Sequence, residues 1–343
     1  MTLGWRVRLL GRALVAATGP VAAMSSAKRQ ALRRQAAPRR LREYLNGKVA
    51  IGVTRADALV PTPDGDLAVR IYRPTTVTSG TGLPVVVAFH GGGWIFGDLN
   101  TAEWLFSEVA ARVQALVVAV DYRLAPEHPA PAAHRDALRA TAWAAEHAAE
   151  LGGRADRLAV LGESSGATLA AAASLAARDS GGPRIACQAL LYPITDLTLS
   201  SPSVAELPDE PILRSADLRA YVDLYLGPDG DPIDPYVSPL LARDHRGLPP
   251  ALILTADHDP LRDDGRCYAG RLTRSGVPVR HIEYADSPHG FFSFPNICPA
   301  ARPALDALTD DLRRALWLPE GDEPQLLETS SGPPDNARTC TYA

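Results

Sequence analysis

The 343-residue sequence predicts an α/β fold in which a mostly parallel central sheet carries helices on both faces. Two observations lead to this prediction. Short runs that are almost entirely apolar recur from residue 85 onward, as is typical of strands buried on both faces. Alanine-rich stretches separate these runs, and each is long enough for the right-handed crossover that joins two parallel strands. The composition, 46% hydrophobic and 22% charged, fits a globular chain of one or two domains.

The elements follow one another in a regular order. The first strand is predicted where apolar and polar residues alternate after Asp64 and Gly65, a pair typical of a hairpin turn. The predicted strands are 67–72, 85–89, 116–120, 158–161, 189–191, 251–254 and 279–284. The predicted helices are 131–149, 165–178, 217–225 and 300–316, the last of which closes the fold.

Three segments do not follow this alternation of strands and helices. Residues 1–50 are strongly basic, with nine arginines against Glu43 as the only acid, and residues 196–235 are rich in prolines and acids. We expect both to contribute to a cap over one edge of the sheet, the first as helices and the second as an insertion in a main domain of residues 51–318. Residues 319–343 are acidic and aperiodic and are predicted to form a disordered tail.

The N-terminal segment loosely resembles a signal peptide, because three arginines precede the apolar stretch 13–24. That stretch contains Gly19 and Pro20 and is shorter than the roughly twenty residues that span a bilayer. We therefore expect a cytoplasmic protein whose basic segment packs on the body, with export or membrane contact as the less favoured alternative. The net charge of −4 provides no basic field, so no nucleic-acid partner is expected.

The cysteines give no sign of a metal site. They show neither C-x-x-C spacing nor histidine neighbours at the intervals of metal ligands. We expect no metal and no cofactor, and we expect unpaired thiols because a disulfide framework is unusual in a long chain with few cysteines. The four residues are Cys187, Cys267, Cys298 and Cys340.

Residues 162–166 read G-E-S-S-G and lie between the predicted strand 158–161 and the predicted helix 165–178. In this context G-x-S-x-G indicates a tight strand-to-helix turn that presents a serine at a helix N-terminus, where developing negative charge is favoured. Small neighbours are needed because strand and helix pass close together there. Ser164 is therefore the candidate nucleophile. The plain alternative is a serine that only caps a helix.

A serine hydroxyl needs a base to take its proton, and His289 is the candidate. It follows the predicted strand 279–284 and precedes the last helix, so we expect it at the same sheet edge as Ser164. Five other histidines lie on or beside a helix, in a polar loop or within a strand and are predicted to be structural or solvated. They are His128, His134, His147, His245 and His281.

An acid is needed to fix the tautomer of that histidine and to stabilise its protonated form. Asp259 follows the predicted strand 251–254 and is the candidate. Asp257, Asp263 and Asp264 are close rivals on the sequence alone. Asp259 could also simply cap a helix that starts at the following proline.

Residues 90–94 read H-G-G-G-W and follow the predicted strand 85–89. Consecutive glycines let backbone N–H groups approach a substrate oxygen, and each such donor commonly lowers the barrier by about 3 kcal/mol. The amide of Ser165, directly after the candidate nucleophile, would add another donor. A phosphate-binding loop is the competing interpretation, but no Gly-Lys-Ser/Thr follows these glycines.

With these motifs the chain resembles the hormone-sensitive-lipase-like esterase family of the α/β-hydrolase superfamily, from about residue 60 to 317. Five motifs carry the resemblance: HGGGW at 90–94, DYRLAPE at 121–127, GESSG at 162–166, DPLRD at 259–263 and HGF at 289–291. The resemblance implies an α/β-hydrolase fold with a helical cap made from the N-terminal segment and the insertion. The elbow departs from the usual GDSAG or GTSAG of the family at Glu163 and Ser165.

The resemblance also implies a function. It implies a cofactor-independent carboxylesterase that cleaves small-molecule esters of short to medium acyl chains through a Ser-His-Asp triad and an acyl-enzyme, with Gly92, Gly93 and Ser165 forming the oxyanion hole. An amidase or a natural-product deacetylase would use the same machinery and stays an alternative. A non-catalytic ligand-binding receptor on the same scaffold is a second alternative, against which the presence of His289 speaks. The oligomeric state is left open by a single sequence.

Overall fold

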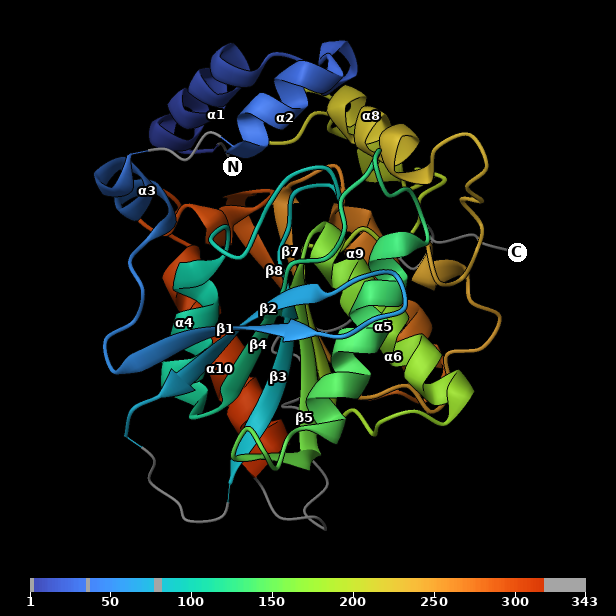
Figure 1. Ribbon diagram of the computed structural model, residues 1–343. Coiled ribbons are helices and arrows are strands. Elements are labelled where there is room, and N and C mark those ends of the chain that lie inside the picture. Colours follow the sequence, from blue (N-terminus) through green and yellow to red (C-terminus); the bar gives the residue numbers. More distant parts are fainter. Residues whose placement is uncertain (1–2, 35–37, 77–81, 318–343) are drawn as a thin grey trace.

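The computed structural model describes residues 3–34, 38–76 and 82–317 and is built around one eight-stranded sheet (Figure 1). The strand order is β1-β2-β4-β3-β5-β6-β7-β8. The strands are β1 (Val53–Val60), β2 (Leu67–Pro74), β3 (Leu83–Phe89), β4 (Leu116–Val120), β5 (Gly153–Glu163), β6 (Cys187–Leu191), β7 (Ala251–His258) and β8 (Val279–Pro288). Strand β2 runs antiparallel to both of its neighbours, and β3 to β8 are parallel.

The predicted strands are confirmed, and one strand was not predicted. Strand β1 forms a hairpin with β2 through the turn at Gly65, whose φ of 111° suits glycine. Most of β1 is exposed because it lies at the edge of the sheet, so it lacks the apolar run by which the other strands were found. Every residue of β3 and β4 is buried, which explains their nearly continuous apolar sequence.

Helices cover both faces of the sheet. Helices α4 (Glu103–Val113) and α10 (Ala301–Trp317) pack on one face, and α5 (Ala132–Glu146), α6 (Ser165–Ser180) and α9 (Arg262–Arg274) pack on the other (Figure 1). Two large apolar clusters, one for each face, form the core. The predicted helices are confirmed with ends shifted by a few residues, whereas α4 and α9 were not predicted.

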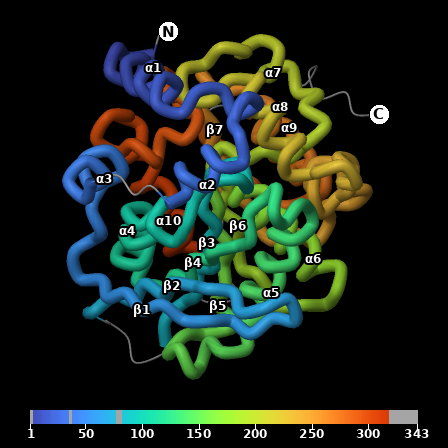
Figure 2. The backbone as a smooth tube through the Cα atoms, turned by 45° about the horizontal axis from the view of Figure 1, so that its top comes forward, coloured from blue at the N-terminus to red at the C-terminus, as the bar shows by residue number. Residues whose placement is uncertain are grey.

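The remaining helices lie above the end of the sheet at which the parallel strands terminate (Figures 1 and 2). They are α1 (Trp5–Thr18), η1 (Val21–Ala23), α2 (Ser26–Arg34), α3 (Arg39–Asn46), α7 (Pro202–Glu206) and α8 (Ser215–Leu226). The N-terminal segment meets α8 in a small apolar cluster of Val21, Met24 and Ala220, and the Val21 amide donates to Asp217 at 2.8 Å. Short 3-10 turns occur at η2 (Pro239–Leu241) and η3 (Phe291–Ser293).

One prediction about the cysteines was wrong. Cys187 and Cys298 are free and buried, but Cys267 is disulfide-bonded. Spacing along a sequence does not report distance in the fold, so the pattern of cysteines carried no signal for this bond. Cys340 and the predicted tail 319–343 lie outside the described residues. Among the described residues, no helix is both long and apolar enough to cross a membrane.

Candidate active site

The turn between β5 and α6 places Ser164 at the sheet edge. Its backbone has φ 53° and ψ −120°, a sparsely populated conformation that is typical of functional turns. A Cβ atom added to Gly162 would lie 2.1 Å from the Gly166 carbonyl oxygen, and one added to Gly166 would lie 2.2 Å from that of Phe89. Only glycine fits at these two positions. Ser164 itself is partly exposed, although both residues beside it are buried.

Three predicted residues meet at this turn. His289 Nε2 lies 2.9 Å from Ser164 Oγ, and His289 Nδ1 lies 2.7 Å from Asp259 Oδ2. Asp259 is completely buried, and its second oxygen accepts the Leu261 amide at 2.8 Å. The ring of His289 is thus held at both nitrogens. This is the geometry that a serine needs to lose its proton to a neutral imidazole.

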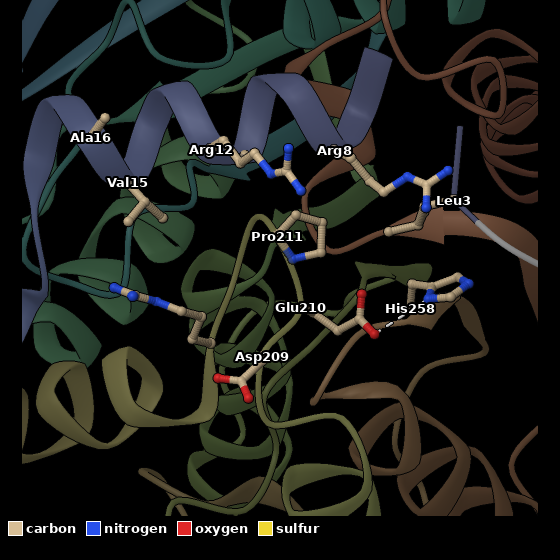
Figure 3. Close-up of a pocket in the computed structure, with 11 residues that line it drawn as sticks. Leu3, Arg8, Arg12, Val15, Ala16, Asp209, Glu210, Pro211 and His258 are labelled. Atoms are coloured by element: carbon tan, nitrogen blue, oxygen red, sulfur yellow. Dashed lines mark hydrogen bonds and ion pairs between the residues drawn. The ribbon is translucent and has the colours of Figure 1, made fainter. Parts of the chain in front are cut away.

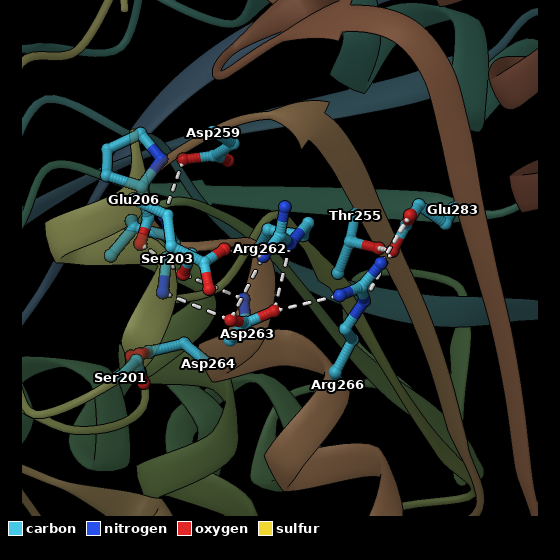
Figure 4. Close-up of polar contacts among 12 residues, drawn as sticks. Ser201, Ser203, Glu206, Thr255, Asp259, Arg262, Asp263, Asp264, Arg266 and Glu283 are labelled. Atoms are coloured by element: carbon cyan, nitrogen blue, oxygen red, sulfur yellow. Dashed lines mark hydrogen bonds and ion pairs between the residues drawn. The ribbon is translucent and has the colours of Figure 1, made fainter. Parts of the chain in front are cut away.

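The rival acids serve other parts of the structure. The carboxylate of Asp257 accepts the amides of Asp286 and Ser287 at 2.9 and 3.0 Å, so it braces the loop that leads to His289. Asp263 bridges Arg262 and Arg266 (Figure 4).

Asp264 also serves the structure, because it binds the amides of Thr195 and Asp196 at 2.7 and 3.0 Å. The structure therefore places one of the four candidate acids against the histidine.

The rival histidines also have other partners. His134 Nδ1 lies 2.5 Å from the hydroxyl of Tyr225, and burial lowers the pKa of His134 to about 3. His281 contacts Thr255, and burial lowers its pKa to about 4. His245 is buried and lies 2.9 Å from the carbonyl oxygen of Pro239, although the sequence placed it in a polar loop. None of these contacts involves Ser164.

The glycine loop after β3 approaches Ser164 from the side. Gly92 and Gly93 have φ of 126° and 62°. A Cβ atom on Gly92 would lie 2.2 Å from the Phe96 carbonyl oxygen, and one on Gly93 would lie 2.5 Å from the ring of Tyr221 in α8. Within residues 3–34, 38–76 and 82–317, the amides of Gly92, Gly93 and Ser165 donate to no protein acceptor. These three donors remain available to a ligand.

The segment 121–127 supports the glycine loop. The hydroxyl of Tyr122 donates to the His90 carbonyl at 2.9 Å, and the two rings stack with centroids 4.3 Å apart. Burial raises the pKa of Tyr122, which keeps the hydroxyl protonated as a donor. The Ala125 amide donates to the Trp94 carbonyl at 3.0 Å. The DYRLAPE motif thus holds both ends of the HGGGW motif.

Sequence reasoning missed the role of Glu163. Its buried carboxyl group accepts the Gly91 amide at 3.3 Å through one oxygen and the Tyr192 hydroxyl at 2.8 Å through the other. The Tyr192 ring lies edge-on to His289 with centroids 5.0 Å apart. Burial raises the pKa of Glu163, while the bonds from Tyr192 and Gly91 and the nearby His289 oppose this shift. Glu163 therefore links the turn at Ser164, the glycine loop and His289.

Three potential metal ligands lie close together beside the loop that leads to His289. Asp257, His258 and Asp286 bring ligand atoms within 4.8 Å of one another. The carboxylate of Asp257 already accepts two backbone amides, and His258 Nδ1 lies 3.3 Å from Glu210. Asp257 and His258 are therefore engaged within the protein, whereas Asp286 Oδ1 is buried without a hydrogen-bond partner in the described part of the chain; we assign no metal to these residues.

Comparisons with known proteins show related esterases of the same fold. A family model described as alpha/beta hydrolase fold matches residues 86–293. Carboxylesterase NlhH of Mycobacterium tuberculosis is 45% identical over 73% of this chain and 79% of its own length. Esterase LipI of the same organism is 42% identical over 79% of this chain and 85% of its own.

Solved structures of esterases support the same fold and family. A hyperthermophilic esterase from the archaeon Pyrobaculum calidifontis superposes with a TM-score of 0.82 at 33% identity, covering 91% of this chain and 98% of the other. An ester hydrolase from the metagenome of Lake Arreo gives 0.83 at 32% identity, again over 91% and 98%. The resemblance deduced from the five motifs is confirmed, and the chain belongs to the hormone-sensitive-lipase-like family of α/β hydrolases.

Proposed function

We propose that this carboxylic ester hydrolase works through Ser164, His289 and Asp259 as a catalytic triad. Ser164 Oγ attacks the ester carbonyl carbon while His289 Nε2 takes its proton. His289 then gives that proton to the leaving alcohol, and a water molecule hydrolyses the acyl-enzyme by the same route. Asp259 holds the imidazole and stabilises its protonated form. The contacts of 2.9 and 2.7 Å at the two ring nitrogens are the observation that carries the proposal.

The negative oxygen of the tetrahedral intermediate would be bound by the amides of Gly92, Gly93 and Ser165. They are donors on the two segments that flank Ser164, and no protein acceptor uses them in the described part of the chain. Glycine at 92 and 93 is required by the close approach of Phe96 and Tyr221. Donors fixed in this way stabilise charge that develops in the transition state without reorganising. No cofactor takes part in this scheme.

We further propose short to medium acyl esters as substrates. Two relatives named arylesterase, from Saccharolobus solfataricus, and ethyl acetate hydrolase, from Pseudomonas putida, are each 36% identical to this chain. We propose that residues 1–50 and the insertion 196–235 form the cap over the catalytic domain of residues 51–318 and shape the approach to Ser164. The ring of Tyr221, against Gly93, brings this insertion to the oxyanion donors.

The test is hydrolysis of p-nitrophenyl esters from acetate to palmitate by the wild type, Ser164→Ala and Ser165→Ala. Removing the nucleophile should lower kcat by about 10⁴-fold or more. Ser165→Ala is the matched control, because it keeps the backbone amide and should retain activity within a few-fold. Turnover should peak at short or medium chains. Undiminished turnover by a folded Ser164→Ala protein would exclude the proposed nucleophile.

A further inference from the structure

Helix α1 has two apolar faces, and only one of them packs on the protein. Val7, Leu10 and Gly11 are buried against the body, where a Cβ on Gly11 would lie 2.3 Å from the Pro211 carbonyl oxygen. The opposite face holds Trp5 and Leu9, whose exposed fractions are 67% and 59%. Ala13 and Ala16 continue the same stripe at helical spacing and are also exposed. No residue of the described protein covers this stripe.

Arginines border the exposed stripe on both sides. Arg6 directly follows Trp5, and Arg8 directly precedes Leu9. Arg12 lies one helical turn after Arg8. Helix α1 contains no acidic residue. Within the residues that the structure describes, neither Arg8 nor Arg12 forms an ion pair. The exposed stripe is therefore flanked by Arg6, which lies over the Trp5 ring, and on its other side by Arg8 and Arg12, whose side chains reach toward the cavity between α1 and the body.

Arg8 and Arg12 share a cavity of about 590 Å³, between α1 and the loop 209–214, with two acids (Figure 3). Figure 3 shows Arg8 and Arg12 along one wall and Glu210 opposite, next to His258. His258 Nδ1 lies 3.3 Å from Glu210, so that acid has a partner of its own. Asp209, on the same wall as Glu210, is the other acid that lines the cavity. Arg8 and Arg12 on the opposite wall therefore outnumber this remaining acid.

Helix α3 extends the same kind of surface. Leu41 and Tyr44 are 48% and 59% exposed, and the exposed Arg40 lies beside them. Both views place α3 on the same flank of the molecule as α1 (Figures 1 and 2). Large apolar side chains exposed among arginines thus recur on the two outermost helices of the N-terminal segment.

We propose that the outer face of α1, together with α3, binds the surface of a membrane that contains anionic lipids. Trp5, Leu9, Leu41 and Tyr44 would enter the boundary between headgroups and acyl chains, while the arginines bind lipid phosphates. The 14 residues of α1 are too few to span a bilayer, so the helix lies in the interface. A second copy of this chain is the poorer occupant, because pairing two such faces brings like charges together.

Sedimentation with vesicles tests the proposal without using activity. The wild type should bind vesicles of phosphatidylcholine that contain phosphatidylglycerol, bind pure phosphatidylcholine weakly, and dissociate as salt is raised. Trp5→Ala/Leu9→Ala should lower the partition coefficient at least about tenfold. The matched control is Leu59→Ala/Ile233→Ala, which removes equally exposed side chains (59% and 61%) away from the N-terminal helices and should bind as the wild type does.

Fluorescence locates the contact. Trp5 is the one exposed tryptophan among the described residues, so bromine-labelled lipids should quench part of the emission, and Trp5→Phe should abolish that quenching while leaving sedimentation nearly unchanged. All these variants should unfold at the wild-type temperature, because the substituted side chains are exposed. Equal sedimentation of the wild type and Trp5→Ala/Leu9→Ala would overturn the proposal. So would a wild-type dimer in solution that this double substitution converts to a monomer, since the face would then belong to a second copy.

Discussion

The catalytic edge of the sheet and the N-terminal helices are built in opposite ways. At the proposed catalytic edge Ser164, Asp259 and His289 each follow a parallel strand, and Asp259 and His289 are themselves buried with hydrogen bonds on both sides. Helices α2 and α3 contain no fully buried side chain. They are held by separate polar contacts, such as the bond of 2.9 Å from the Asn46 amide group to the Ser293 carbonyl.

This difference predicts which amino-acid substitutions the protein tolerates. A site fixed by buried hydrogen bonds loses function when one bond is lost, because the partner group is then left unsatisfied inside the protein. A layer fixed by a few surface contacts opens at low free-energy cost and can vary in shape. We therefore expect substitutions at the catalytic edge to act on kcat, and substitutions in the N-terminal helices to act mainly on substrate binding.

Among the residues that support Ser164, the largest effect is expected from Asp259→Asn. The amide keeps the size of the side chain but cannot hold the histidine in the required tautomer, so kcat should fall by about 10³- to 10⁴-fold. Asp257→Asn is the matched control, because Asp257 binds two backbone amides ahead of His289 and does not touch the ring. Its effect on kcat should be smaller than about 100-fold. Steady-state kinetics on p-nitrophenyl butyrate gives both numbers, and a reversed order would reassign the acid.

Glu163→Gln should have the second largest effect. An amide offers an acceptor at only one of the two positions, so with Oε1 on the Gly91 amide the Tyr192 hydroxyl must turn to accept from Nε2, and the carboxylate charge near His289 is lost. We expect kcat to fall by about 10- to 100-fold with KM nearly unchanged, since the altered contacts position groups that act in the transition state.

Two further variants show whether Glu163 is a positioning residue. Glu163→Asp keeps both acceptor oxygens and should retain more activity than Glu163→Gln. Tyr192→Phe removes only the hydroxyl, and its effect should not add to that of Glu163→Gln, because both break the same link. Additive losses, or equal losses for Asp and Gln, would show that Glu163 acts by packing alone.

The sequence predicted the catalytic edge far better than the segments around it. Ser164 and Asp259 could be named because the buried strands before them read as apolar runs, and His289 because it stands between the last strand and the last helix. Strand β1 was missed because an exposed edge strand has no such run. Asp257, Asp263 and Asp264 could not be ranked, because their partners are far away in the sequence and close only in the fold.

Glu163 was noticed as a departure from the usual elbow, but its role was not. Its partners Gly91 and Tyr192 belong to two other strand ends, and nothing in the local sequence indicates that one carboxyl group joins them. The same limit applies to Arg33, which the sequence shows only as one of nine arginines in a basic segment. Contacts between distant segments need the fold to be seen.

Arg33→Gln tests how the N-terminal helices are held to the body, and its effect on substrate binding should be moderate. The guanidinium group of Arg33, in α2, donates to the carbonyl oxygens of Ile95 and Ala125 at 2.7 and 2.6 Å and to Glu127 at 2.9 Å. It therefore ties the N-terminal helices to the segment that follows the glycine loop. We expect KM to rise several-fold and kcat to stay within about twofold, since hydrogen bonds from a charged donor contribute about 1.5 to 3 kcal/mol each.

The matched control for Arg33 is its exposed neighbour in α2, Arg34. Arg34→Gln removes the same charge without removing the three bonds and should leave KM unchanged. Hydrogen exchange should show faster exchange in α2 for Arg33→Gln alone. Identical kinetics and exchange for the two variants would mean that α2 is fixed by packing rather than by Arg33.

Asp264→Asn, beside the start of the insertion 196–235, should have the smallest effect on turnover. Its effect on the free energy of unfolding should be clear. The buried carboxyl group of Asp264 binds the amides of Thr195 and Asp196 and the hydroxyl of Ser201, where the insertion leaves the sheet. Burial raises the pKa of Asp264 to about 7, whereas an unfolded chain has an aspartate pKa of about 3.9. Between these two values the native protein holds a proton that the unfolded chain has released.

The free energy of unfolding contributed by Asp264 must therefore fall as pH rises from about 4 to about 7, because the native state binds more protons than the unfolded state throughout that window. Asparagine stays neutral and can keep the same hydrogen bonds, so this part of the pH dependence should vanish in Asp264→Asn. Urea unfolding at several pH values should show the variant gaining stability relative to the wild type, by an amount on the order of a few kcal/mol, as pH rises. Parallel curves would mean that Asp264 does not titrate in this window, and that the root of the insertion is as insensitive to pH as the rest of the core.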